Sequence, residues 1–112
     1  MELECRNMGD ITLAKPLDRR VDARSAEDLK EGLTTLIEAG RRFVALDLSS
    51  VDFVDSSGLG AMISAFKALE SRGELAIVGP CPVVRSLFKM TGTDSLFRIF
   101  DDEDEALAAL GR

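Results

Sequence analysis

The 112-residue sequence predicts an α/β fold built on a mostly parallel β-sheet. Two features of the chain predict it. Short apolar runs typical of buried strands alternate with segments in which apolar residues recur at helical spacing. Glycine follows several of the helical segments, as is common where a helix ends. Strands that alternate with helices favour parallel pairing through crossover helices.

The chain opens with an expected β-hairpin. Residues 3–5 and 11–14 are short stretches of alternating apolar residues, and the turn residues 7–10 lie between them. Residues 16–24 are charged and show no apolar period, so we expect a loop there.

A first helix is expected after that loop. Ser25, with Asp28 three residues later, resembles a capping box, and Gly40 marks the end of the helix. Apolar residues recur between them at helical spacing. Residues 43–48 then form a short apolar run, which predicts a buried strand.

The second half of the chain repeats this pattern. A helix is expected from Leu59, ended by Gly73, and a strand at 75–78. A short helix follows, which Gly92 ends; its inward residues are Val84, Leu87 and Phe88. The last expected elements are a strand at 96–100 and a helix that begins with the acidic residues 101–104. The acidic run 101–105 is a candidate interaction tail, but we favour a solvated first helical turn, which suits acidic side chains.

The charge of the chain excludes several partners. It has 14 basic and 20 acidic residues, a net charge of −6. Binding to nucleic acid or to an anionic membrane needs a surplus of cations. No apolar run approaches the roughly 18–20 residues of a membrane span. Since the first residues are acidic and unlike a signal peptide, we expect a cytoplasmic protein that binds neither nucleic acid nor membrane.

The sequence contains no histidine, which excludes Ser-His-Asp and Cys-His catalytic arrangements. Cys5 and Cys81 match no metal-ligand or CxxC spacing, so we interpret them as reduced, partly buried thiols. We therefore expect no metal and no cofactor.

The most informative segment lies at the predicted junction between a strand and the second helix. It consists of Asp55-Ser56-Ser57-Gly58-Leu59-Gly60. Serine is a preferred N-cap, and the two glycines allow a backbone or a phosphate to come close to the helix N-terminus. An N-cap with packing glycines and no further role is the alternative interpretation.

Catalysis is not indicated at this segment. It lacks the G-x-S-x-G pattern of a nucleophile elbow and the lysine of a P-loop. Paired carboxylates are available in principle, but their spacing gives no sign of acid–base chemistry; the candidates are Asp18, Asp22, Asp47 and Asp55. We therefore expect a protein that is not an enzyme.

The segment from Val54 to Gly60 resembles the signature of the STAS family, the bacterial anti-sigma-factor antagonists. The similarity covers roughly residues 3–110. It extends to the stretches 21–26, 44–49, 75–79 and 84–88, and to Thr91-Gly92. One departure is visible, since residues 15–22 lack the Gly of a Gly-x-Leu-Asp turn that often precedes the first helix in this family.

The resemblance implies a single STAS domain over residues 1–112. Its mixed, mostly parallel sheet would have about five strands, with about four helices mainly on one face. The unphosphorylated form would bind a serine kinase of the GHKL ATPase type that also acts as an anti-sigma factor, and so release the sequestered regulator. Phosphorylation of Ser56, with Ser57 as the alternative acceptor, would break the complex. A PP2C-type phosphatase would reset it, and the free chain would be a monomer.

The resemblance also implies a partner-binding surface. The motif contributes Asp55, Ser56, Ser57, Gly58, Leu59 and Gly60 to it. Asp22, Arg24, Ser25 and the exposed side of the 59–72 helix are added because the expected fold brings them near the motif.

Two other functions remain open from the sequence. Some STAS domains are passive scaffold subunits of stress-sensing assemblies or of transporter complexes. A nucleotide-binding module is a third possibility, which rests only on the glycine-flanked helix start.

Overall fold

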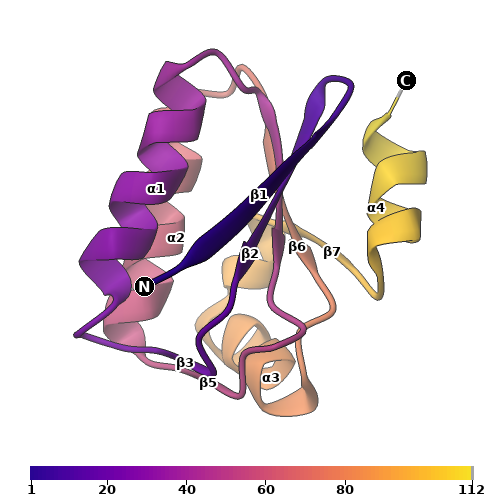
Figure 1. The fold of residues 1–112 in the computed structure, drawn as a ribbon. Coiled ribbons are helices and arrows are strands. Elements are labelled where there is room, and N and C mark those ends of the chain that lie inside the picture. The colour runs from indigo at the N-terminus through magenta and orange to yellow at the C-terminus, as the bar shows by residue number, and fades with distance from the viewer. Residues whose placement is uncertain (112) are drawn as a thin grey trace.

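The computed structural model describes residues 1–111 and has three layers (Figure 1). Helices α1, α2 and α3 cover one face of a five-stranded sheet, and α4 covers the other. The elements in chain order are β1 (Leu3–Met8), β2 (Ile11–Pro16), β3 (Arg20–Val21), α1 (Ala26–Glu38), β4 (Phe43–Asp47), β5 (Phe53–Val54), α2 (Ser56–Ala68), β6 (Glu74–Val78), α3 (Pro82–Thr91), the 3-10 turn η1 (Thr93–Ser95), β7 (Arg98–Phe100) and α4 (Glu103–Leu110).

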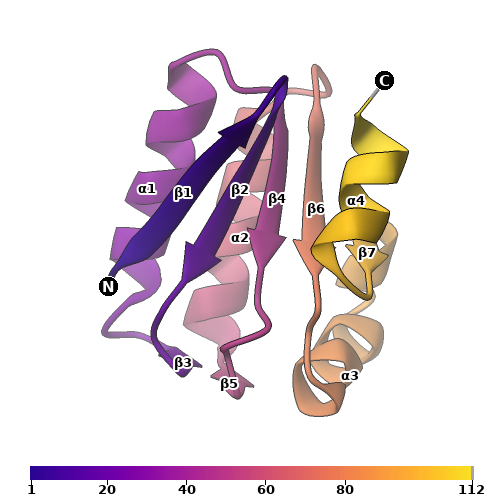
Figure 2. The same ribbon diagram turned by 45° about the vertical axis from the view of Figure 1, so that its right-hand side comes forward.

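The main sheet confirms the predicted α/β class. Its strand order is β1-β2-β4-β6-β7 (Figure 2). The hairpin strands β1 and β2 are antiparallel, whereas the three pairs β2–β4, β4–β6 and β6–β7 are parallel. Each parallel connection runs through a helix, as parallel pairing requires. The sheet is therefore mixed and mostly parallel, with five strands.

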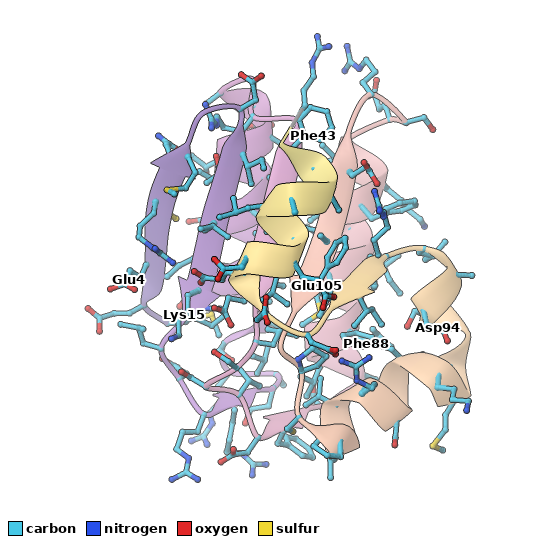
Figure 3. The ribbon with its side chains drawn as sticks, turned by 90° about the vertical axis from the view of Figure 1, so that its right-hand side faces the viewer. Glu4, Lys15, Phe43, Phe88, Asp94 and Glu105 are labelled. Atoms are coloured by element: carbon cyan, nitrogen blue, oxygen red, sulfur yellow. The ribbon has the colours of Figure 1, made fainter. Side chains whose placement is uncertain are left out.

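The central strands are apolar because both of their faces are covered. On the face of α1 to α3, Leu46 and Ile77 pack into the larger core, together with Leu33, Met62 and Phe88. On the opposite face, Ala45 and Ala76 form the floor beneath α4. Their small side chains let α4 approach the sheet closely (Figure 3).

The acidic run at 101–105 begins α4. The Asp102 side chain is its N-cap and accepts a hydrogen bond of 2.8 Å from the Glu105 N–H. Glu103 pairs with Arg6 of β1 at 2.6 Å, which ties α4 to the hairpin. The favoured interpretation of this run as a helical first turn is confirmed.

A second, two-stranded sheet corrects the prediction of a loop at 16–24. Strand β3 pairs with β5 in parallel, with Arg20 opposite Phe53 and Val21 opposite Val54. Each strand has only two residues, and only Val21 and Val54 face the core. Two residues are too few to show a period of two, so the sequence pattern missed both strands.

Three smaller expectations were wrong. The Ser25 hydroxyl makes no cap hydrogen bond to α1. Cys5 is exposed because β1 is an edge strand with few covered residues, whereas Cys81 is half-buried. Helix α2 begins at Ser56 and ends at Ala68, before Gly73, because the chain turns at Glu70 and Ser71, which have positive φ angles of 53° and 63°.

Candidate functional site

The site lies where β3 and β5 lead into their helices. The Asp55 N–H donates a hydrogen bond of 3.1 Å to the Val21 carbonyl, which continues the β3–β5 ladder by one step. Asp22 therefore lies beside Asp55, although 33 residues separate them in the sequence. The short sheet thus joins the 20–25 loop to the start of α2.

Asp55, not a serine, is the N-cap of α2. Its backbone is extended, with φ −99° and ψ −175°, and its Oδ1 accepts a hydrogen bond of 3.0 Å from the Gly58 N–H. Asp55 therefore has the geometry of a helix N-cap, as the alternative interpretation of the motif expects. Ser56 and Ser57 follow as the first helical residues, and both are exposed. The N-terminus of a helix favours negative charge, so an anion on either serine is compatible with the fold.

The two glycines of the motif have different environments. A Cβ on Gly58 would lie 2.5 Å from the Val21 carbonyl oxygen and 2.8 Å from Val21 Cγ1. A Cβ on Gly60 would meet nothing within 4 Å. The expected close approach of a backbone therefore holds at Gly58 only. Leu59, between them, is buried and packs into the core.

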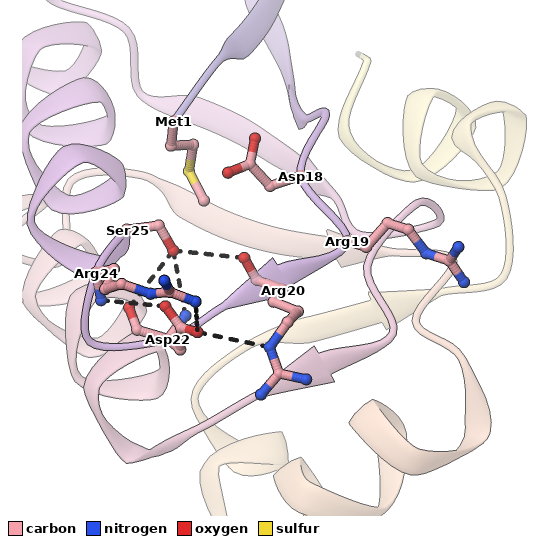
Figure 4. A pocket seen from close by; sticks show the side chains of 7 residues that line it. All are labelled: Met1, Asp18, Arg19, Arg20, Asp22, Arg24 and Ser25. Carbon is pink, nitrogen blue, oxygen red and sulfur yellow. Dashed lines mark hydrogen bonds and ion pairs between the residues drawn. The ribbon is translucent and has the colours of Figure 1, made fainter.

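The 20–25 loop is organised around Asp22 (Figure 4). Its Oδ1 accepts a hydrogen bond of 3.1 Å from the Arg24 N–H. Its Oδ2 lies 3.6 Å from Arg20 Nε and 4.0 Å from Arg24 Nη2. Ser25 is buried, and its Oγ accepts a hydrogen bond of 3.1 Å from the Asp22 N–H. Ser25 thus shapes the loop from inside, while Arg24 presents an exposed side chain.

A hollow of about 520 Å³ opens beside this loop, as Figure 4 shows. Its lining carries both positive and negative side chains, from arginines and aspartates close together in the sequence. The lining residues are Met1, Asp18, Arg19, Arg20, Asp22, Arg24 and Ser25.

A second surface near the site was missed by the sequence analysis. An apolar groove of about 400 Å³ lies between β5 and α3. Val83 and Met90 stand at its rim with 67% and 85% of their surfaces exposed. They are seven positions apart and so lie on one side of α3, outside its inward stripe. The spacing of Val83 and Met90 in the sequence could have indicated this second apolar side of α3. The groove is lined by Phe53, Val54, Pro82, Val83, Val84, Ser86, Leu87 and Met90.

Phe53 joins the two surfaces. Its ring forms part of the apolar groove, and the Arg20 guanidinium carbon lies 4.2 Å from the ring centroid. This is the geometry of a cation–π contact. One continuous surface is therefore formed by the 20–25 loop, the start of α2 and the apolar groove.

Three of the four carboxylates named as possible acid–base groups, Asp22, Asp47 and Asp55, have structural partners. Asp55 and Asp22 are adjacent, but each accepts a backbone N–H. Asp47 is buried and accepts a hydrogen bond of 2.9 Å from the Ser49 N–H. Burial acts to raise the pKa of Asp47, but hydrogen bonding, including that from Ser49, outweighs it and holds the pKa below its ordinary value.

Metal ligands and membrane spans can be assessed over residues 1–111. That part of the chain holds no group of three or more Cys, Asp or Glu placed to bind a metal ion. None of its helices combines the length and the apolar character that crossing a membrane requires.

Comparison with known proteins identifies relatives of this chain. The sequence model of the STAS domain matches residues 8–106. The anti-sigma-B factor antagonist of Listeria monocytogenes is 34% identical over 86 residues, which cover 76% of this chain and 75% of the relative.

Solved structures share the fold. An anti-sigma factor antagonist from Mycobacterium paratuberculosis superposes with a TM-score of 0.90 and 21% identity, covering 99% of this chain and 94% of the other. The phosphorylated form of the Bacillus cell fate determinant SpoIIAA gives a TM-score of 0.74 and 20% identity, covering 96% and 98% of the two chains. At these identities the superpositions show the shared fold.

The contrast between the two glycines is testable by matched substitutions. Gly58→Ala forces a Cβ against the Val21 carbonyl, so we expect a loss of about 1–3 kcal/mol in unfolding free energy. Gly60→Ala meets open space inside a helix, so we expect a gain of about 0.5–1 kcal/mol. Urea unfolding followed by circular dichroism measures both. Equal effects of the two substitutions would contradict the assigned contact.

Proposed function

Because this chain belongs to the STAS domain family of anti-sigma factor antagonists, we propose that it acts by partner switching. The unphosphorylated chain binds an anti-sigma factor that is also a serine kinase of the GHKL ATPase type. This binding releases the regulator that the kinase sequesters. The kinase transfers a phosphoryl group from ATP to Ser56, and the complex dissociates. A PP2C-type phosphatase removes the phosphate.

One observation carries this proposal: Ser56 is an exposed hydroxyl at the first position of α2, directly after a capping aspartate. A kinase can reach it without unfolding the chain. Asp55 holds the helix start in place through Gly58. SpoIIAA, which shares the fold, has been solved in a phosphorylated form, and this supports a phosphate on such a fold. Ser57 is also exposed and is the alternative acceptor.

The switch follows from where the charge is added. Phosphorylation adds a charge of about −1.5 to −2 near neutral pH. The helix N-terminus tolerates that charge, so the fold should survive. In a complex, however, the phosphate must lose water beside the carboxylates of Asp22 and Asp55. An unpaired buried charge is costly, and a loss of about 2.7 kcal/mol weakens a complex roughly a hundredfold.

The surfaces of this chain around Ser56 form the area that contacts the anti-sigma factor. We place it on the start of α2, on the 20–25 loop and on the apolar groove between β5 and α3. The groove qualifies because Phe53 and Val54, which line it, directly precede the cap residue Asp55. Burial of Val83 and Met90 supplies apolar area, while the loop supplies charge. Of the residues predicted for the interface, we propose that Asp22, Arg24, Asp55, Ser56, Ser57 and Gly60 face the partner. Ser25, Gly58 and Leu59 are buried and shape this surface from inside.

The acceptor assignment predicts opposite behaviour for two Ser56 variants. Ser56→Ala removes the hydroxyl, so the chain should bind its kinase in the presence of ATP without dissociating. Ser56→Asp should bind about tenfold to a hundredfold more weakly, because it buries a charge at the interface. Titration calorimetry with the cognate kinase measures both affinities, with Ser57→Ala as the matched control.

Mass spectrometry of the protein from its own cells locates the phosphate. A phosphatase-sensitive gain of about 80 Da on Ser56 is expected. A gain on Ser57 would move the acceptor by one residue. An unmodified chain that copurifies with transporter subunits would contradict the switch and favour the scaffold role.

The apolar groove predicts a second interface effect. Met90→Glu should weaken kinase binding by about tenfold to a hundredfold, because burial of a Met side chain is worth about 1.5–3 kcal/mol. Met8→Glu is the control, since Met8 is also exposed, at 46%, and is the last residue of β1. Figure 1 shows the turn between β1 and β2 at the opposite end of the molecule from β3 and β5. The unfolding free energies of both variants should match that of the unchanged chain. Equal binding by both would remove the groove from the interface.

A further inference from the structure

Two arginines beside the phosphorylation site have weak partners. Arg20 and Arg24 approach Asp22 at 3.6 and 4.0 Å. Charge-assisted hydrogen bonds of guanidinium groups are about 2.7–2.9 Å long, so both contacts are loose. The side chains are 59% and 90% exposed. Arg19, by contrast, forms a close pair with Asp52 at 2.6 Å.

The pairing of β3 with β5 places this loop next to Ser56. Arg20 lies opposite Phe53, and the ladder continues to Asp22 beside Asp55. Neighbouring strands are about 4.8 Å apart, and alternate residues share a face. Val21 and Val54 point into the core, so Arg20, Asp22 and Asp55 lie on the outer face. The contact of Arg20 with the Phe53 ring agrees with this orientation.

The charges on this outer face are balanced before phosphorylation. Two carboxylates, Asp22 and Asp55, and two guanidinium groups, Arg20 and Arg24, belong to this face and the loop that follows it, and both guanidinium groups approach Asp22. Asp55 is committed to the Gly58 N–H, and Asp22 Oδ1 to the Arg24 N–H. The two cations are the groups with freedom to move. Nearby Asp18 lines the hollow, and Asp52 is occupied by Arg19.

We propose that Arg20 and Arg24 bind the phosphate of phosphorylated Ser56 within the same chain. The proposal rests on the proposed function, because it concerns the phosphorylated form. A phosphate offers up to two negative charges and three acceptor oxygens, against one charge on Asp22. A guanidinium group can bind a phosphate in a bidentate manner, through two parallel hydrogen bonds. The phosphate therefore draws both arginines from Asp22, and Arg20 leaves the Phe53 ring.

The two arginines offset part of the phosphate's charge, so their movement is a second way in which phosphorylation weakens the complex, beside the remaining cost of burying the phosphate. A partner that contacts the unphosphorylated loop meets Arg20 stacked on Phe53 and Arg24 near Asp22. After phosphorylation the same partner meets a Phe53 ring without its arginine and an Asp22 carboxylate without its guanidinium partners. Phosphorylation at one residue thus changes the surface of the 20–24 loop as well as that of α2.

Titration of the phosphate itself tests the proposal. The full chain is prepared with phosphoserine incorporated at position 56, so no kinase is needed. Phosphorus NMR at low ionic strength then gives the second pKa of the phosphate, which is ordinarily about 6. Nearby guanidinium groups favour the dianion, so this pKa should lie lower in the unchanged chain. In Arg20→Gln/Arg24→Gln it should rise by about half a unit to one unit.

A matched double variant controls for net charge. Arg85→Gln/Arg98→Gln removes the same two charges from α3 and β7, and its phosphate should titrate as in the unchanged chain. Arg20→Lys/Arg24→Lys keeps the charges without the planar fork and should retain part of the shift. Thermal unfolding confirms that each variant is folded. Identical titration of the Arg20/Arg24 and Arg85/Arg98 glutamine variants would overturn the arginine pair.

The two proposals fail separately. If the phosphate titrates as expected but no kinase modifies Ser56, partner switching is wrong and the arginine pair stands as a property of this surface. If the kinase modifies Ser56 but the titration is unchanged by Arg20→Gln/Arg24→Gln, partner switching stands and the arginine pair is wrong.

Discussion

The contact between α2 and β3 at Gly58 is the constraint on which the site depends. No side chain separates the helix from the Val21 carbonyl, where even a methyl group would lie only 2.5 Å from the oxygen. This closeness lets the Asp55 N–H reach the same carbonyl at 3.1 Å and extend the two-stranded sheet. The sheet in turn places Asp22 next to the cap residue. The exposed serines are thus held beside a loop that is distant in sequence. Gly58, one backbone hydrogen bond and the four residues of β3 and β5 are what hold them there.

The site combines rigid and adaptable parts. Val21, Val54 and Leu59 are buried and fix the backbone on which the functional groups stand. Ser56, Ser57 and the arginines lie outside and are free to meet a partner. The proposed switch needs this combination, since in it a phosphate changes binding without disturbing the core. The helix N-terminus suits that purpose because its partial positive charge already favours an anion.

The parts of the fold that the sequence predicted are those with repeated patterns. Leu29 and Leu33 recur at helical spacing and are both buried in α1, and the apolar runs of β4 and β6 became the central strands. Strands β3 and β5 are too short to carry a period. The identity of the N-cap was open because serine and aspartate are about equally good caps. The apolar groove was missed because exposed Val83 and Met90 come together with Phe53 only in the folded chain.

The exposed β1 has a consequence for association. It is one edge of the main sheet, and a free edge with unpaired backbone groups invites pairing with another chain. Along β1, charged Glu4 and Arg6 stand exposed, and at the opposite edge β7 has only three residues. Charged side chains and short edge strands both discourage strand addition between molecules. Both edges are thus protected against growth into larger sheets, so neither edge favours association of two molecules by strand addition.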